Sequence, residues 1–103
     1  MRGNTRDNAE IIKHQANVVN AVNSYCNASV TLSVLANTFC VSENTISGWF
    51  CEAVEKRYVA SDAVCHQVMS KHIAEYETKH ALTNSSLRRQ YNDAFSARAL
   101  ATA

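Results

Sequence analysis

The segment that most restricts the fold runs from Thr31 to Val54 and holds two short apolar-periodic stretches with a break between them. Apolar residues recur at three- and four-residue spacing on each side of the break, which is the spacing that lines one face of a helix. Thr31 stands directly before the first stretch and Ser42 before the second. A hydroxyl oxygen at such a position accepts a hydrogen bond from the first-turn backbone N–H groups. The segment therefore predicts two helices joined by a tight turn at residues 39–41.

This segment resembles the helix-turn-helix family of DNA-binding proteins. The family places a small residue inside the first helix, a tight turn after it, and aliphatic or aromatic residues on the inner face of the second helix. Those places are occupied here by Ala36, Cys40, Ile46 and Trp49. The turn differs from the family pattern, which usually has glycine there, because a cysteine with a positive φ costs on the order of 1 kcal/mol.

The second half of the segment is similar to homeodomain-like members through its adjacent Trp49 and Phe50. A homeodomain continues with a base-reading asparagine and two arginines, whereas this chain continues with Glu52, Ala53 and Val54. Membership of the homeodomain family proper is therefore not supported, and the resemblance to helix-turn-helix proteins covers residues 31–54 of 103.

The composition indicates an all-α fold. The chain has 103 residues, no proline and two glycines, so it offers few hairpin turns and permits long helices. A single domain of this length buries roughly two-thirds of the surface of the unfolded chain. Helical stripes and N-cap residues predict about five helices, over residues 7–27, 32–38, 43–57, 62–80 and 85–98.

The expected organisation is a flexible N-terminus over residues 1–6, a three-helix core with the helix-turn-helix over residues 7–57, and two further helices over residues 58–103. The first helix is expected to brace the helix-turn-helix pair. The last two helices exceed what a three-helix binding domain needs, and two roles stay open for them: packing on the core or forming a dimer interface. The last six residues, from Arg98 onward, offer little to bury and are expected to fray.

The resemblance implies a DNA contact surface at the start and along the outer face of the second helix of the pair. Amide and hydroxyl side chains in such places bond to base edges and phosphates, and glutamate accepts from the cytosine amino group. Gly48 either lets a DNA strand come close or makes room for a neighbouring helix, and both readings stay open. The predicted DNA-binding residues are Thr31, Ser42, Glu43, Asn44, Thr45, Ser47, Gly48, Lys56 and Arg57.

The charge pattern keeps two classes of function open. The formal net charge is +1, and no Lys or Arg lies between Ala16 and Glu55. Binding to a polyanion must therefore come from local charge.

The first hypothesis is sequence-specific binding of double-stranded DNA, as a transcriptional regulator or a small protein of a phage or mobile element. A homodimer would suit this function, because binding two DNA half-sites raises the affinity of a protein that carries few positive charges. The alternative is a helical protein–protein interaction module that keeps the helix-turn-helix architecture without binding DNA.

Other function classes find no support in the sequence. The chain lacks a Gly-rich phosphate loop, an H-E-x-x-H motif and a G-x-S-x-G motif. It also lacks the short Cys spacing of zinc sites, so we expect no enzyme activity, metal, cofactor or small-molecule ligand. No stretch approaches the roughly 18 apolar residues that span a bilayer, and no secretory signal is found, so we expect a cytoplasmic protein.

Three further expectations concern side chains whose surroundings decide their role. The four cysteines are expected to be reduced thiols that fill the core. Trp49 is expected in the core beside Ile46, with Phe50 against the first or the fourth helix. The histidines of the fourth helix are interpreted as surface residues; they are His66, His72 and His80.

Overall fold

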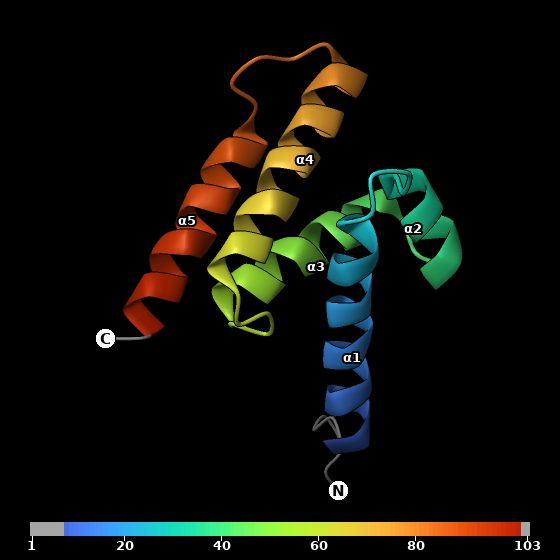
Figure 1. Ribbon diagram of the computed structural model, residues 1–103, viewed down its shortest axis with the longest axis vertical. Helices are drawn as coiled ribbons and strands as arrows, with labels where there is room; N and C mark the ends of the chain where they lie inside the picture. The colour runs from blue at the N-terminus through green and yellow to red at the C-terminus, as the bar shows by residue number, and fades with distance from the viewer. Residues whose placement is uncertain (1–7, 102–103) are drawn as a thin grey trace, which may run out of the picture.

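The computed structural model describes residues 8–101, and within them the prediction of an all-α fold with about five helices is confirmed (Figure 1). No strand occurs in that range, and the expected flexible segment at residues 1–6 lies outside it. The helices are α1 (Asn8–Tyr25), α2 (Leu32–Phe39), α3 (Glu43–Glu55), α4 (Asp62–His80) and α5 (Ser86–Ala101).

The predicted N-caps form. Thr31 Oγ1 accepts from the backbone N–H of Val34 at 3.3 Å, and Ser42 Oγ accepts from that of Thr45 at 3.1 Å. Ser61 likewise caps α4. These bonds satisfy N–H groups that have no partner inside a first helical turn, so the chain begins each of these helices where a hydroxyl stands.

The turn between α2 and α3 has a residue with a positive φ, the conformation for which the helix-turn-helix pattern usually has glycine. Cys40 adopts φ 58° and ψ 43°, and the N–H of Val41 bonds to the carbonyl of Ala36 at 3.0 Å. A second left-handed residue, Arg57 with φ 59°, follows α3. The third helix therefore ends at Glu55, two residues before the predicted end at Arg57.

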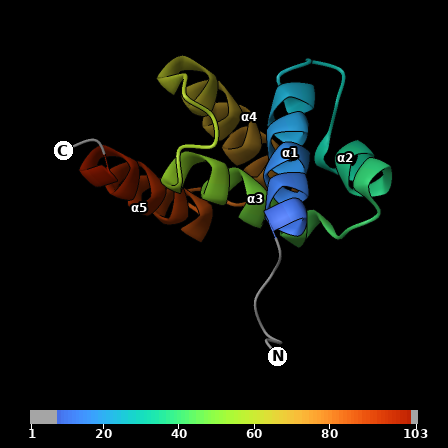
Figure 2. The same ribbon diagram turned by 90° about the horizontal axis from the view of Figure 1, so that it is seen from below.

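Helix α3 crosses the middle of the molecule. The pair α1 and α2 packs on one side of it and α5 packs along the other, as Figure 1 and the turned view in Figure 2 both show. Helix α4 contacts α3 and α5. The core therefore has α3 at its centre, and its largest fully buried side chains are Tyr25, Tyr91, Phe50, Leu35, Ile46 and His72.

Two polar side chains that the sequence did not place in the core are buried. His72 is 0% exposed, so its interpretation as a surface residue is wrong, while His66 and His80 are exposed. Arg98 is 2% exposed and its helix continues to Ala101, so the expected fraying from Arg98 is wrong for this part of the chain. His72 bonds to Tyr91 of α5 and Arg98 bonds to the carbonyl of Val54 in α3, and a one-dimensional helical pattern does not reveal such partners.

The aromatic pair of α3 confirms the expectation for Phe50 and corrects the one for Trp49. Phe50 is 0% exposed and lies against Tyr25 of α1, with ring centroids 4.9 Å apart. Trp49 is only half-buried, with its ring edge-on to Phe39 at 5.5 Å and to His14 at 5.9 Å. The position of Trp49 inside the core is therefore corrected to the edge of the core.

The four cysteines are free thiols, but they do not share one environment. Cys65 is buried, Cys26 and Cys51 are half-buried, and Cys40 is exposed. The expectation of core-filling thiols therefore fails for Cys40, because the left-handed turn directs this position to solvent. Across residues 8–101 no helix is both long and apolar enough to cross a lipid bilayer.

Candidate nucleic-acid interface

The outer face of α3 carries Asn44, Thr45 and Gly48, all of which are exposed. A Cβ atom placed on Gly48 would meet nothing within 4 Å. The reading in which Gly48 makes room for a neighbouring helix is therefore wrong. A helix interior is an unfavourable place for glycine, by about 1 kcal/mol relative to alanine, and no packing contact within residues 8–101 requires one here.

The two N-terminal hydroxyl residues of the predicted site are capping residues. Thr31 and Ser42 bond to the first turns of α2 and α3. Ser42 Oγ also lies 3.0 Å from Thr45 Oγ1. Both caps are exposed. The carboxylate of Glu75 accepts from the backbone N–H of Leu32 at 3.0 Å and offsets the positive dipole end of α2. Each hydroxyl already has a structural role, and contact with a phosphate would be added to it.

Glu43, the first residue of α3, is held by two neighbouring helices. Its carboxylate pairs with Lys79 of α4, Nζ to Oε1 at 2.9 Å, and accepts from Ser33 Oγ of α2 at 3.1 Å. The hydrogen bond from Lys79 lowers the pKa of Glu43 and, reciprocally, raises that of Lys79. The negative charge of Glu43, which would repel a DNA phosphate, is thus partly offset by Lys79. Lys79 is in turn occupied by this ion pair.

Lys56 and Arg57 lie at the opposite end of α3. Twelve residues separate Asn44 from Lys56, which is about 18 Å along a helix axis. Arg57 is half-buried, and its Nη1 donates to the carbonyl of Arg98 at 3.4 Å. The structure therefore does not bring these two cations together with the residues at the start of α3.

Several other cations are engaged inside the molecule. Lys71 donates to three backbone carbonyls around the end of α1, those of Tyr25, Asn27 and Val30, at 2.6–2.8 Å. Arg88 pairs with Glu77 at 2.8 Å, and buried Arg98 pairs with Asp62 at 2.8 Å. These positive charges hold the fold and contribute little attraction at the face of α3.

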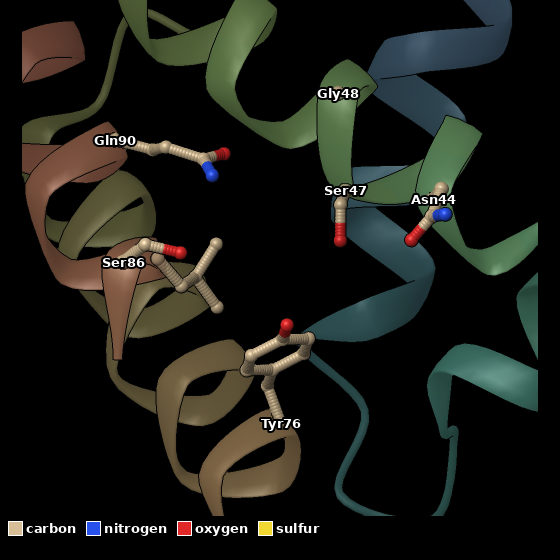
Figure 3. Close-up of a pocket in the computed structure, with 7 residues that line it drawn as sticks. Asn44, Ser47, Gly48, Tyr76, Ser86 and Gln90 are labelled. Atoms are coloured by element: carbon tan, nitrogen blue, oxygen red, sulfur yellow. The ribbon is translucent and has the colours of Figure 1, made fainter. Parts of the chain in front are cut away.

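Beside this face lies a cavity of about 260 Å³ that the sequence did not predict. Asn44 and Ser47 point into it from α3, Gln90 and Ser86 point from α5 on the opposite side, and Tyr76 directs its hydroxyl into it from α4 (Figure 3). Gly48 and Leu87 complete its lining. Three of the predicted site residues therefore share one cavity with side chains that follow about 30 to 45 positions later, a separation at which helical periodicity carries no signal.

A buried polar chain stands behind Ser47. Ser47 Oγ lies 2.9 Å from His72 Nε2, and His72 Nδ1 lies 2.6 Å from the hydroxyl of Tyr91. Both His72 and Tyr91 are 0% exposed. Burial lowers the pKa of His72 to about 4, so the imidazole is neutral at physiological pH. Burial also raises the pKa of Tyr91 well above its usual value.

Comparison with known protein families, with curated proteins and with solved structures finds no match for this chain. In the part of the chain that the structure describes, no group of three or more His, Cys, Asp or Glu side chains is arranged to hold a metal ion.

Proposed function

We propose that this protein binds double-stranded DNA in a sequence-specific manner, with the outer face of α3 in the major groove and the N-terminus of α2 toward the backbone. The observation that carries the proposal is Gly48, an exposed glycine inside α3 with open space where its side chain would be. A glycine that lowers helix stability without serving internal packing is explained by close approach of an external partner to the helix backbone.

The residues around Gly48 suit the edge of a base pair. Asn44 lies one helical turn before it, and an asparagine amide pairs bidentately with adenine. Thr45 offers a hydroxyl and a methyl group, and the methyl group fits the methyl of thymine. Both are exposed, at the end of the helix where the dipole favours the negatively charged backbone. The expected role is that of a transcriptional regulator or a small DNA-binding protein of a phage or mobile element.

The decisive experiment is selection from random duplexes at two salt concentrations, followed by affinity measurements on single substitutions. Gly48→Ala should raise the free energy of unfolding by up to about 1 kcal/mol and weaken binding to the enriched sequence. Ser70→Ala, on an exposed position of α4, is the matched control: it also favours the helix but should leave DNA affinity unchanged. Failure to enrich any motif, with no binding at low salt, would rule out the proposal.

The alternative class, a protein–protein interaction module, is favoured by one observation. The exposed side chains Asn44 and Thr45 of this face are neutral, and Glu43 beside them is paired with Lys79. In that case Gly48→Ala would weaken binding to a protein partner, while the duplex selection would return nothing.

A homodimer would resolve the shortage of cations on the DNA reading. Two copies related by a two-fold axis present two reading helices to half-sites one DNA turn apart and double the number of backbone contacts. Sedimentation of the protein at micromolar concentration without DNA tests this part: a dimer supports it, and a monomer contradicts it.

A further inference from the structure

The cavity between α3, α4 and α5 has the features of a ligand site rather than of a packing gap. Its walls come from three helices, and the groups that point into it are amides and hydroxyls of Asn44, Ser47, Tyr76, Ser86 and Gln90. Accurately placed polar groups fix the orientation of a small molecule in its site, and this cavity has five polar groups from three helices. Its volume of about 260 Å³ lies below the range of about 300–1,000 Å³ that suits drug-sized ligands, so the occupant is a single small ring system.

The buried chain behind Ser47 fixes the direction of one hydrogen bond into the cavity. Among the described residues, the only acceptor within reach of the Tyr91 hydroxyl is His72 Nδ1 at 2.6 Å. Tyr91 therefore donates to Nδ1, and the proton of the neutral imidazole sits on Nε2 and is donated to Ser47 Oγ at 2.9 Å. Because the oxygen of Ser47 accepts this bond, its hydroxyl hydrogen is left to donate to a molecule in the cavity.

The remaining groups define the chemistry of the ligand. No Lys, Arg, His, Asp or Glu lines the cavity, so a charged ligand would lose its hydration without gaining a partner of opposite charge. Asn44 and Gln90 face the gap from opposite walls, and each carboxamide can both donate and accept (Figure 3). Such side chains pair bidentately with a ring that carries adjacent N–H and C=O groups. Leu87 provides an apolar surface beside them.

We propose that this cavity binds an uncharged heteroaromatic lactam of nucleobase size, held between Asn44 and Gln90 with Ser47 as a donor. A free base and a base carried on a nucleic-acid strand share this chemistry. The site includes Asn44, Ser47 and Gly48, so its occupant would compete with a partner docked on α3. Ligand binding itself does not depend on duplex binding, and the two proposals fail or succeed separately.

The test is a titration followed by NMR of the side-chain amide groups of Asn44 and Gln90. Uracil is the free probe and a thymidine hexamer is the strand-borne probe. 1,3-Dimethyluracil, in which methyl groups replace both ring N–H groups, is the matched negative probe. We expect saturable shifts of both amides with uracil, with the hexamer, or with both, and none with the dimethyl compound. Absence of shifts with both uracil and the hexamer overturns the proposal, as does an equal response to 1,3-dimethyluracil.

Substitutions then locate the site. Gln90→Ala, at an exposed position, should lower affinity by about 3- to 10-fold, the effect of one net hydrogen bond. Ser47→Ala should do the same, and because it leaves His72 Nε2–H without its partner, Gln90→Ala provides the measurement free of a folding effect. Ser96→Ala, on an exposed part of α5 outside the cavity, is the control. Unchanged affinity in both cavity variants would place the ligand elsewhere and overturn the proposal.

Discussion

The guanidinium of Arg98, near the end of α5, donates from Nε to Asp62 Oδ1 at the start of α4, over 2.8 Å. The same group donates to the carbonyl of Ala60 at 2.8 Å and to that of Val54 at 3.2 Å. One side chain therefore joins the end of α3, the linker and the beginning of α4. The flat, forked guanidinium has the several donors in fixed directions that this arrangement needs, whereas a lysine ammonium does not.

Replacing Arg98 should be strongly destabilising. Arg98→Ala removes the side-chain donor from the carbonyls of Val54 and Ala60 together with the ion pair to Asp62, and we expect the free energy of unfolding to fall by about 2 kcal/mol in urea titrations. Arg98→Lys should recover only part of this. Arg89 is an exposed residue in the first turn of the same helix. The free energy of unfolding of Arg89→Ala should stay within about 0.5 kcal/mol of that of the parent protein. Equal stabilities for the Arg98 and Arg89 variants would contradict the role of Arg98.

Burial of His72 makes stability depend on pH in the weakly acid range. Its pKa falls from 6.5 to about 4 in the folded protein because burial disfavours the charged imidazolium. Between pH 6.5 and 4 the unfolded chain therefore binds more protons than the folded protein. The free energy of unfolding decreases as the pH falls through this range, and the loss is complete below pH 4. The full effect is about 3 kcal/mol. Unfolding free energies measured across pH 7 to 4 should show this slope in the parent protein, and His72→Gln should remove it.

Glu77 should act in a lower pH range. It accepts from the backbone N–H and the hydroxyl of Ser85 and from two nitrogens of Arg88, at 2.8–2.9 Å. These bonds, that of Arg88 first, lower the pKa of Glu77 from 4.5 to about 2. Its stabilising effect is present above pH 4.5 and is lost as the pH falls to 2. Glu77→Gln should remove the dependence of the unfolding free energy on pH between 4.5 and 2. Arg88→Gln, which keeps the two hydrogen bonds from Ser85 to Glu77, should remove only part of this pH dependence.

The left-handed turn offers a substitution that stabilises the fold. Cys40 has φ 58°, a conformation that costs a residue with a Cβ about 1 kcal/mol or more. Cys40→Gly should therefore raise the melting temperature, although the greater freedom of glycine in the unfolded chain offsets part of the gain. Cys40→Ala keeps the Cβ and should change stability little, since the thiol is exposed. A lower melting temperature for the glycine variant would contradict this account of the turn.

The sequence was sufficient for those features that neighbouring residues determine. Hydroxyl residues at 31 and 42 predicted the starts of α2 and α3, and apolar spacing predicted the number of helices. Features that depend on distant residues were missed. His72 was placed at the surface and Arg98 in a fraying end because their bonding partners lie on other helices, 19 or more positions away. The cavity beside Asn44 was missed for the same reason, because half of its wall belongs to α4 and α5.

The central position of α3 limits how a protein of this design can change its specificity. Every other helix packs on α3, and Ile46, Phe50, Ala53 and Val54 are committed to the core. Substitutions that alter the surface without disturbing the fold are therefore confined to a few solvent-facing sites, chiefly positions 44, 45 and 48. Divergence among descendants of this chain would be expected to concentrate at such exposed positions, while the four core positions of the helix stay nearly invariant.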